Sequence, residues 1–366
     1  MKFKDIMRRY ISPFSRVSVC LLAFCLAAKL VAVIFPAFAD FFNRYISGFT
    51  RAVFATVTAI FPFSLAELTV ITVVPLSLLY LLYCIFCLSS TDKLTRHLFN
   101  VLGITCLLFS AFILNLGIAY DCTPLEKKAD LDTASVTAND VYDACAILLD
   151  ELSEIEGTLP RDKNGAAVSP YTFNEAAKKL NESYKNLYKE YPFLSRIYVA
   201  PKRIALSKPM TYTGISGVYT FFTGEANVNT NFPSYSTVFT TAHEMAHQRG
   251  VAPEDEANFM AFAACYTSGD SYLKYCALVE MANFLSNTLY YNDKALFIKA
   301  QALFSEQTLD EYREYENAYD PYRGSIVGEA ATEINDAYLK VQGQSEGVAS
   351  YSLVSALATA YILKTH

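Results

Sequence analysis

Charged residues are scarce in this chain. Lysine, arginine, aspartate and glutamate make up 18% of its 366 residues, and 53% of the residues are hydrophobic. An average soluble protein has roughly 25% charged residues. The mean hydropathy is positive, at +0.22. This composition argues against a wholly soluble enzyme, a disordered chain and a nucleic-acid binder with a basic face.

The charges that are present are divided unevenly along the chain. Residues 1–120 carry ten lysines and arginines against four acidic residues, a net of +6. Residues 121–366 carry 20 basic and 32 acidic residues, a net of −12. The length allows two domain-sized units. We therefore expect a transmembrane region over 1–120 and a water-exposed domain over 121–366.

Three apolar stretches are long enough to cross a bilayer as helices, which takes roughly 20 residues. They cover about residues 17–39, 65–88 and 98–120. Lys29 lies in the middle of the first stretch, where a charge is costly unless it faces protein or water. Glu67 lies near an end of the second, where its carboxylate can reach the membrane interface. The sequence thus predicts three membrane-spanning helices.

Basic residues beside these stretches set their direction. Five lysines and arginines, the last of them Arg16, precede the first stretch, and Lys93 and Arg96 lie between the second and third stretches. Positively charged loops stay in the cytoplasm. We therefore expect a cytoplasmic N-terminus, with everything beyond residue 120 outside the cytoplasm. The loop over 40–64 is then also outside, with its apolar piece at 53–61 along the membrane surface.

A cleavable signal peptide is the alternative for the first stretch, because Ala37-Phe38-Ala39 resembles a signal-peptidase site. The stretch is long for a signal peptide, so we favour an uncleaved anchor. With either alternative, the second and third stretches leave the C-terminal part outside.

The nine cysteines give little information on function. Five lie in the apolar stretches, where packing is their usual role. The other four lie in the outer part, where a disulfide could form in an oxidising compartment. Their connectivity cannot be read from the sequence, so no bridge is predicted. These four are Cys122, Cys145, Cys265 and Cys276.

Residues 121–366 have the patterns of a mainly α domain with a small β-sheet. Between 197 and 231, β-branched and aromatic residues alternate with glycines, which predicts short strands with tight turns, most clearly at 218–222. Apolar residues at helical spacing, or capping signals, mark the predicted helices. These cover 141–155, 173–188, 234–249, a segment from 253, 271–291, 294–306, 309–318, 327–340 and 347–363.

One motif indicates metal chemistry: residues 243–247 read His-Glu-Met-Ala-His, an HExxH sequence. Residues four apart lie on one face of a helix, so His243 and His247 can bind the same ion. Glu244 lies one step round the helix, where it can act as general base on a water molecule.

A third metal ligand must be a carboxylate. The other two histidines are His97, in the expected cytoplasmic loop, and His366, at the chain end. After the turn at 250–253 the chain restarts as a helix, and its first turn carries Glu254 and Glu256. The geometry of a helix start favours Glu254 and leaves Glu256 as the alternative.

This helix resembles the E-x-x-A-D-x-x-A helix of the gluzincin metallopeptidases, in particular the membrane-bound CAAX-processing and heat-shock protease clan. The resemblance implies that Glu254 is the third ligand and that Asn258 hydrogen-bonds a ligand histidine. Asn258 stands where those families have aspartate, and the gap from His247 to Glu254 is shorter than theirs. The turn after His247 also resembles the H-x-x-G turn of metzincins, but Pro253 replaces their third histidine.

Over nearly its whole length the chain resembles a bacterial family of membrane proteins, the "domain of unknown function 3810" family. The segments that carry this resemblance are 61–67, 223–229, 243–259, 338–340 and 347–351. The resemblance implies a zincin-like outer domain, Zn²⁺ as cofactor and a location in the bacterial cell membrane. It implies no particular substrate.

Further residues are candidates for contact with a substrate. Zincins run a strand beside the active-site cleft, and residues 217–231 are placed for this role. Glu225, Asn227 and Asn229 would then contact substrate or brace the metal helix. The alternative is that they only stabilise a hairpin.

Hydrolysis of an amide also needs a donor for the developing oxyanion. Tyr338 is our first candidate, because the family resemblance includes its surroundings. The other candidates are Tyr351, Tyr212 and Arg323.

Together these features predict a membrane-anchored zinc metallopeptidase. His243, His247 and Glu254 would hold Zn²⁺, and Glu244 would serve as general base. The expected partners are the lipid bilayer and a peptide or protein substrate, and no nucleic acid. A non-catalytic zinc-binding or signalling membrane protein and a hydrolase of cell-wall amides are the alternatives.

Overall fold

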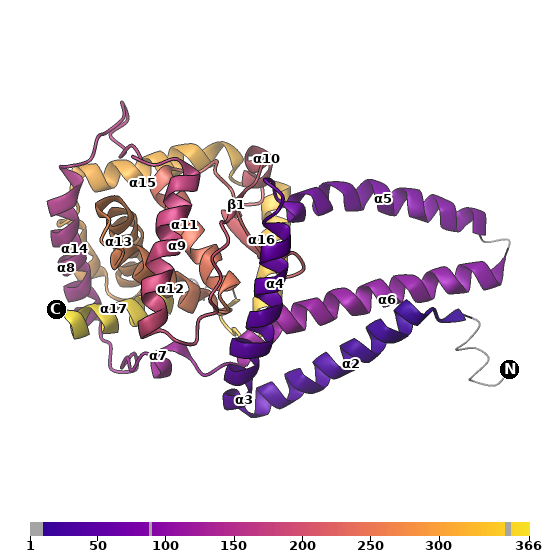
Figure 1. Ribbon diagram of the computed structural model, residues 1–366. Coiled ribbons are helices and arrows are strands. Elements are labelled where there is room, and N and C mark those ends of the chain that lie inside the picture. Colours follow the sequence, from indigo (N-terminus) through magenta and orange to yellow (C-terminus); the bar gives the residue numbers. More distant parts are fainter. Residues whose placement is uncertain (1–9, 88–89, 348–352) are drawn as a thin grey trace.

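The computed structural model describes residues 10–87, 90–347 and 353–366 of the chain (Figure 1). Over these residues the protein is mainly α-helical, with three long apolar helices near the N-terminus and a small three-stranded mixed sheet. The three apolar helices extend from one side of a compact folded part (Figure 1). The predicted fold class is confirmed.

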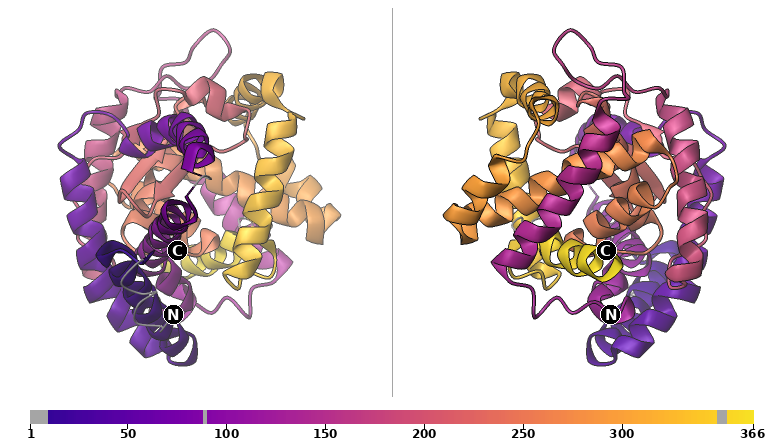
Figure 2. Two further views of the ribbon diagram at one scale, coloured as in Figure 1. Left: turned by 90° about the vertical axis from the view of Figure 1, so that its right-hand side faces the viewer. Right: turned by 90° about the vertical axis from the view of Figure 1, so that its left-hand side faces the viewer.

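The three long helices are α2 (Pro13–Ile34), α5 (Leu65–Cys87) and α6 (Thr91–Asn115), and each is long and apolar enough to cross a membrane. α2 packs along α6, whereas α5 diverges from α6 towards the folded part (Figure 1). The predicted second span matches α5 up to residue 87, and residue 88 lies outside the described ranges. Figure 2, left, views the molecule from the side of these helices.

The first and third spans are shifted from their predicted bounds. α2 ends at Ile34, because Pro36 begins a separate short helix, α3 (Pro36–Phe41). α6 already begins at Thr91 and therefore includes the segment 91–97 that was predicted as a loop. Asp92 in its first turn is favourable there, because acidic side chains interact well with the N-terminal end of a helix.

Lys29 has protein partners at the end of its span. Its Nζ lies 2.7 Å from Asp121 Oδ2 and donates to Gly117 O at 2.8 Å. Both partners belong to the 3₁₀-helix η2 (Gly117–Asp121), which directly follows α6. The ion pair thus compensates the charge in α2 and ties α2 to the C-terminal end of α6.

The segment between the first two spans packs on the folded part. It continues from α3 through the π-helix η1 (Phe42–Ser47) to α4 (Gly48–Thr58). Thr58 Oγ1 donates to Thr223 O at 3.1 Å, on the sheet side. Phe49, Val53 and Val57, spaced four apart, are exposed on the other face of α4. The location of this apolar face along the membrane surface, and the domain division at residue 120, stay predictions.

The folded part surrounds α11 (Ser234–Gln248) and α12 (Glu254–Tyr266) with further helices. Capping boxes at Thr137 and Thr172 begin α8 and α9. The remaining helices are α7 (Leu125–Lys128), α8 (Ala138–Glu156), α9 (Phe173–Glu190), α10 (Ser207–Thr211), α13 (Ser271–Asn292), α14 (Lys294–Gln301), α15 (Glu306–Tyr319), η3 (Asp320–Tyr322), α16 (Ile326–Val341) and α17 (Val354–Thr365).

These helices agree with the predicted ones, with some shifts at their ends. α14 ends at Gln301, short of the predicted 306, and the last predicted helix begins only at Val354. Part of that last prediction, residues 348–352, lies outside the described ranges. Cys122, Cys145, Cys265 and Cys276 are free thiols in the structure.

The sheet has the strand order β1-β3-β2, with β1 (Lys202–Arg203) parallel and β2 (Gly217–Thr220) antiparallel to β3 (Glu225–Val228). β3 is therefore central, and β2 keeps one edge without a strand partner. β2 ends two residues before the predicted 222 because the chain turns at Gly224, which has a φ of +70°.

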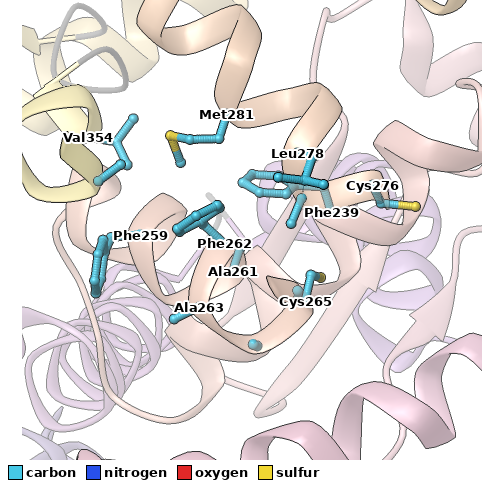
Figure 3. Close-up of a cluster of buried hydrophobic side chains, with 14 of the residues drawn as sticks. Phe239, Phe259, Ala261, Phe262, Ala263, Cys265, Cys276, Leu278, Met281 and Val354 are labelled. Carbon is cyan, nitrogen blue, oxygen red and sulfur yellow. The ribbon is translucent and has the colours of Figure 1, made fainter. Parts of the chain in front are cut away.

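The hydrophobic core lies around α12 and α13. Phe259, Phe262 and Met281 are fully buried there, together with Val354 of α17 (Figure 3). Phe239 of α11 packs into the same cluster (Figure 3). The helices that carry the candidate metal ligands are thus anchored in the most buried part of the protein.

Candidate metal centre

α11 presents its two histidines from a buried helix. Its residues from Val238 to Gln248 are all buried, and the helix stops where Gly250 adopts a φ of +96°. His243 and His247 lie one turn apart near its C-terminal end, with their rings 4.6 Å apart between centroids. The turn at 250–253 then leads directly into α12, whose first residue is Glu254.

Three ligand atoms converge at this point. His243 Nε2 and His247 Nε2 are 2.9 Å apart, and Glu254 Oε2 lies 3.1 Å from the first and 3.4 Å from the second. All three residues are buried, and together they form a group that could hold a metal ion. Glu256 does not belong to this group, because its Oε1 accepts a hydrogen bond from Leu125 N at 2.8 Å.

The far side of each imidazole is fixed by a hydrogen bond. His243 Nδ1 lies 2.8 Å from Asn258 Oδ1, and His247 Nδ1 lies 2.8 Å from Val251 O. A carbonyl oxygen can only accept, so each Nδ1 donates, and each neutral imidazole presents an acceptor at Nε2. Two nitrogen lone pairs and a carboxylate oxygen therefore face one another. This donor set fits a divalent cation.

The pKa values of His247 and Glu254 are shifted in opposite directions by their contact with each other. Burial opposes a charged imidazole at His247, but the contact with Glu254 outweighs it and raises the pKa of His247 to about 9. Burial also opposes an ionised Glu254, but the two histidines hold the pKa of this carboxyl well below its usual range. The cluster attracts a proton strongly, as a set of metal ligands does.

Glu244 lies beside this group with a pKa shifted in the opposite direction. Burial raises the pKa of Glu244 to about 7, and the neighbouring histidines counteract part of this shift. The Tyr219 N–H of β2 donates to its carboxylate. A Cβ atom at Gly217 would lie 2.6 Å from Glu244 Oε1, so glycine at this position leaves room for the carboxyl. The sequence indicated Gly217 only as a turn residue.

A cleft of about 1300 Å³ opens onto these residues. Its lining includes His243, Glu244, His247 and Glu254, together with Tyr338 of α16. The fold thus brings Tyr338 to the same cleft from nearly 100 residues further along the chain.

Tyr338 is held in the cleft by other aromatic residues. Its Oη lies 3.2 Å from Tyr120 Oη, and its ring packs edge-on against Phe112 and Tyr120. Burial raises the pKa of Tyr338 to about 12, so the hydroxyl stays protonated at neutral pH.

Glu225, Asn227 and Asn229 are buried outside the cleft lining. The Glu225 carboxylate accepts from Leu65 N at 3.2 Å and Ala66 N at 2.9 Å, at the start of α5. Asn227 Oδ1 accepts from Ser64 Oγ at 2.6 Å. These bonds join β3 to the start of α5, a contact that none of the sequence-based alternatives named, and the predicted roles of Glu225 and Asn227 stay predictions.

Asn229 makes its bonds within the folded part. Its Nδ2 donates to Ile215 O at 3.1 Å and to Thr211 Oγ1 at 3.2 Å. It therefore fixes the loop that enters β2, and with it the strand beside Glu244.

Sequence reasoning missed a second buried cluster, centred on Arg51 of α4. The guanidinium is fully buried and donates to Asn43 Oδ1 at 2.8 Å, Asn43 O at 2.9 Å, Ser195 Oγ at 2.9 Å and Asn115 O at 3.2 Å. Asn43 Nδ2 in turn donates to Gly250 O at 2.8 Å. The cluster therefore holds the turn that separates the two parts of the metal centre. A charged residue within an apolar segment was the one signal for it in the sequence.

Comparison with known proteins places the chain in a family without assigning an activity. The chain belongs to the family described as "Protein of unknown function (DUF3810)", whose model matches residues 38–359. The match includes α5, α6 and the complete metal centre. No curated protein and no solved structure matches the chain.

Proposed function

We propose that this protein is a membrane-anchored zinc metallopeptidase. One observation carries the proposal: three buried acceptor atoms from His243, His247 and Glu254 converge beside the carboxyl of Glu244, in a cleft large enough for a peptide segment. A purely structural site would have no use for a carboxyl such as Glu244 at this position.

His243, His247 and Glu254 would hold the ion. Two histidines and one glutamate form the protein ligand set of catalytic zinc in several peptidases, which keep a further coordination position for water or substrate. When bound, zinc supplies Lewis acidity, which polarises a carbonyl group and makes a water molecule more acidic. The buried core behind α11 and α12 keeps the ligands in place before any substrate arrives.

Glu244 would act as the general base and then as the general acid. Its carboxylate takes a proton from the attacking water and later returns that proton to the leaving amine. A pKa near 7 suits both steps at neutral pH, because neither the charged nor the protonated form is strongly disfavoured. The hydrogen bond from Tyr219 N–H orients the carboxylate within the cleft.

Tyr338 would donate a hydrogen bond to the oxyanion that develops on the substrate. Its hydroxyl lies on the cleft and keeps its proton at neutral pH. Residues 213–219 line the cleft alongside, so an extended peptide can run along the edge of β2. Glu225, Asn227 and Asn229 would hold this sheet in position rather than touch the substrate.

The metal centre would lie outside the cytoplasm of a bacterial cell. Three crossings that start from a basic, cytoplasmic N-terminus put the folded part on the outer side, and the basic residues before α2 and in the first turns of α6 support this direction. The peptide substrates are then those of the extracytoplasmic space.

The test is zinc content and peptide hydrolysis of the purified full-length protein. We expect about one zinc ion per chain and release of new peptide termini from a mixed peptide library, detected by mass spectrometry. Glu244→Gln should retain zinc and lose hydrolysis by a factor of about 10³ or more, since it removes the base without removing a ligand.

Two outcomes would contradict the proposal. Equal hydrolysis by the wild type and Glu244→Gln, both with zinc bound, would point to a non-catalytic zinc protein. Glu244-dependent release of products from purified cell-wall fragments, with none from peptides, would instead identify a hydrolase of cell-wall amides.

A further inference from the structure

The cleft of the metal centre continues as far as the third membrane helix. Leu108, Phe109 and Phe112 of α6 line it together with His243 and Glu244. Leu108 lies seven residues before the end of α6 at Asn115, which is about 10 Å along the helix axis. In a helix that crosses a bilayer, this end of the cleft lies at the depth of the hydrocarbon chains.

α16 forms a second apolar wall at the same end. Ile334 and Val341 line the cleft, yet 72% and 81% of their surfaces are exposed. Val327 lies seven residues before Ile334, on the same face of the helix, and is also exposed. Figure 2, left, shows α16 across from α4, with α5 and α6 between them. The apolar face of α16 thus borders the region where lipid meets the folded part.

The wall nearest Glu244 has the character of a peptide-binding surface. β2 lies at the edge of the sheet, and the Tyr219 N–H on this edge points away from β3 and donates to Glu244. An edge strand offers backbone donors and acceptors in the spacing of an extended polypeptide. A lipid headgroup or an acyl chain has no matching series of amides.

From these three walls we infer that the substrate is a polypeptide held in the membrane by its own apolar segment, with the scissile bond beside that segment. This polypeptide enters the cleft laterally, between α6 and α16. This inference rests on the proposed peptidase function and names its substrate class. The apolar end of the cleft receives the membrane segment, and the β2 edge receives the adjoining extended residues.

The experiment compares one peptide library in three forms. The full-length zinc protein is placed in phosphatidylethanolamine–phosphatidylglycerol vesicles with a peptide of ten randomised residues. The peptide is either soluble, fused to an apolar helix of about 20 residues, or attached to a phospholipid. New termini are followed by mass spectrometry. We expect the helix-fused form to be cut at least about tenfold faster than the other two, close to the apolar helix, because the membrane concentrates it at the opening of the cleft.

Two leucine substitutions in α6 provide a matched pair. Leu108→Trp narrows the cleft, whereas Leu107→Trp adds the same ring to a neighbouring residue of similar exposure, 41% against 45%, that does not line it. We expect Leu108→Trp to slow cleavage of the helix-fused peptides at least about fivefold relative to Leu107→Trp.

The outcomes separate this inference from the function on which it rests. Glu244-dependent cleavage that is as fast for the soluble or phospholipid form, or that is equal in the two tryptophan variants, overturns lateral entry and leaves the peptidase intact. Absence of Glu244-dependent cleavage of all three forms, with zinc bound, overturns the peptidase function and this substrate class with it.

Discussion

Two buried polar clusters meet at the turn after α11, and they are built in opposite ways. Around Arg51, one cation is surrounded by oxygen acceptors from Asn43, Asn115 and Ser195. At the metal centre, three acceptor atoms face one another. Successive carbonyl groups of the turn serve the two clusters: Gly250 O accepts from Asn43, and Val251 O accepts from His247.

The comparison shows that burial and charge alone do not identify a functional site. Both clusters are buried and charged, but the Arg51 guanidinium meets oxygen acceptors through both of its terminal nitrogens and only its Nε lacks a partner, which makes that cluster structural. The metal centre has a surplus of acceptors, and such a surplus is relieved by a cation. The balance of donors and acceptors is therefore the property that separates the two.

Removing Arg51 should have the largest effect on stability. Arg51→Met leaves the acceptors of Asn43, Asn115 and Ser195 buried without their donor, and we expect a loss of about 3–5 kcal/mol. Thermal unfolding of the full chain in detergent should then shift down by about 10 °C or more. Arg44→Met is the control, because Arg44 is exposed on the same segment. A similar shift in both variants would contradict the structural role of the Arg51 cluster.

Removing one acceptor from the metal centre should mainly affect metal binding. Glu254→Gln keeps the shape of the side chain but replaces the carboxylate ligand with a weaker one. We expect zinc affinity to fall more than about 100-fold. Loss of a residue that only hydrogen-bonds a ligand typically costs about 10–100-fold. Competition with a chromophoric chelator measures this affinity. Glu256→Gln, at the neighbouring carboxyl, should change it less than about threefold. A reversed order would make Glu256 the ligand.

The turn between the clusters tests whether they depend on each other. Gly250→Ala combines a φ of +96° with a Cβ that would lie 2.4 Å from Arg51 Nη2, and we expect a loss of about 2–3 kcal/mol in stability and weaker zinc binding. Gly269→Ala is the matched control, because it has a φ of +72° but nothing within 4 Å. Gly269→Ala should lower the free energy of unfolding by about 1 kcal/mol and leave the zinc affinity unchanged. Equal losses would show that strain alone is responsible.

Glu280 of the cleft is a half-buried acidic residue, and its effect on stability should depend on pH. Burial raises the pKa of Glu280 to about 7, above the ordinary 4.5, so the folded state holds its proton where the unfolded state has lost it. Glu280 therefore does not lower the free energy of unfolding below pH 4.5. Its destabilising effect grows as the pH rises to 7 and is complete above pH 7. Glu280→Gln should raise stability by about 1–2 kcal/mol at pH 8 and leave it unchanged at pH 4. Melting curves at both pH values check this, and an equal gain at both would rule out titration as the cause.

The parts of the site that the sequence predicts are those made by neighbours along the chain. His243 and His247 share a helix face by their spacing, and Glu254 follows after one short turn. The helices of the folded part were predictable for the same reason, because their periodicity and caps are local. The start of α6 was misplaced because a polar, basic segment reads as a loop although it can continue an apolar helix.

Contacts between distant segments could not be predicted from the sequence. The sequence suggested that Glu225 and Asn227 contact substrate, brace the metal helix or stabilise a hairpin, but their partners at the start of α5 lie about 160 residues away. Arg51 could not be interpreted because Asn115 and Ser195 are brought to it only by the fold. Tyr338 was found through the family resemblance, since no local pattern distinguishes it among 26 tyrosines.

The hydrogen bonds from β3 to the start of α5 have a practical consequence for expression of the protein. A truncated chain that begins at residue 121 would lose Leu65 and Ala66 as donors to Glu225, Ser64 as donor to Asn227, and Asn43 as donor to Gly250. Newly exposed polar groups and apolar surfaces would then lie on β3 and at the turn that precedes Glu254. We therefore expect that residues 121–366 do not fold as a separate soluble module, and that biochemical work on the protein needs the whole polypeptide in detergent or lipid.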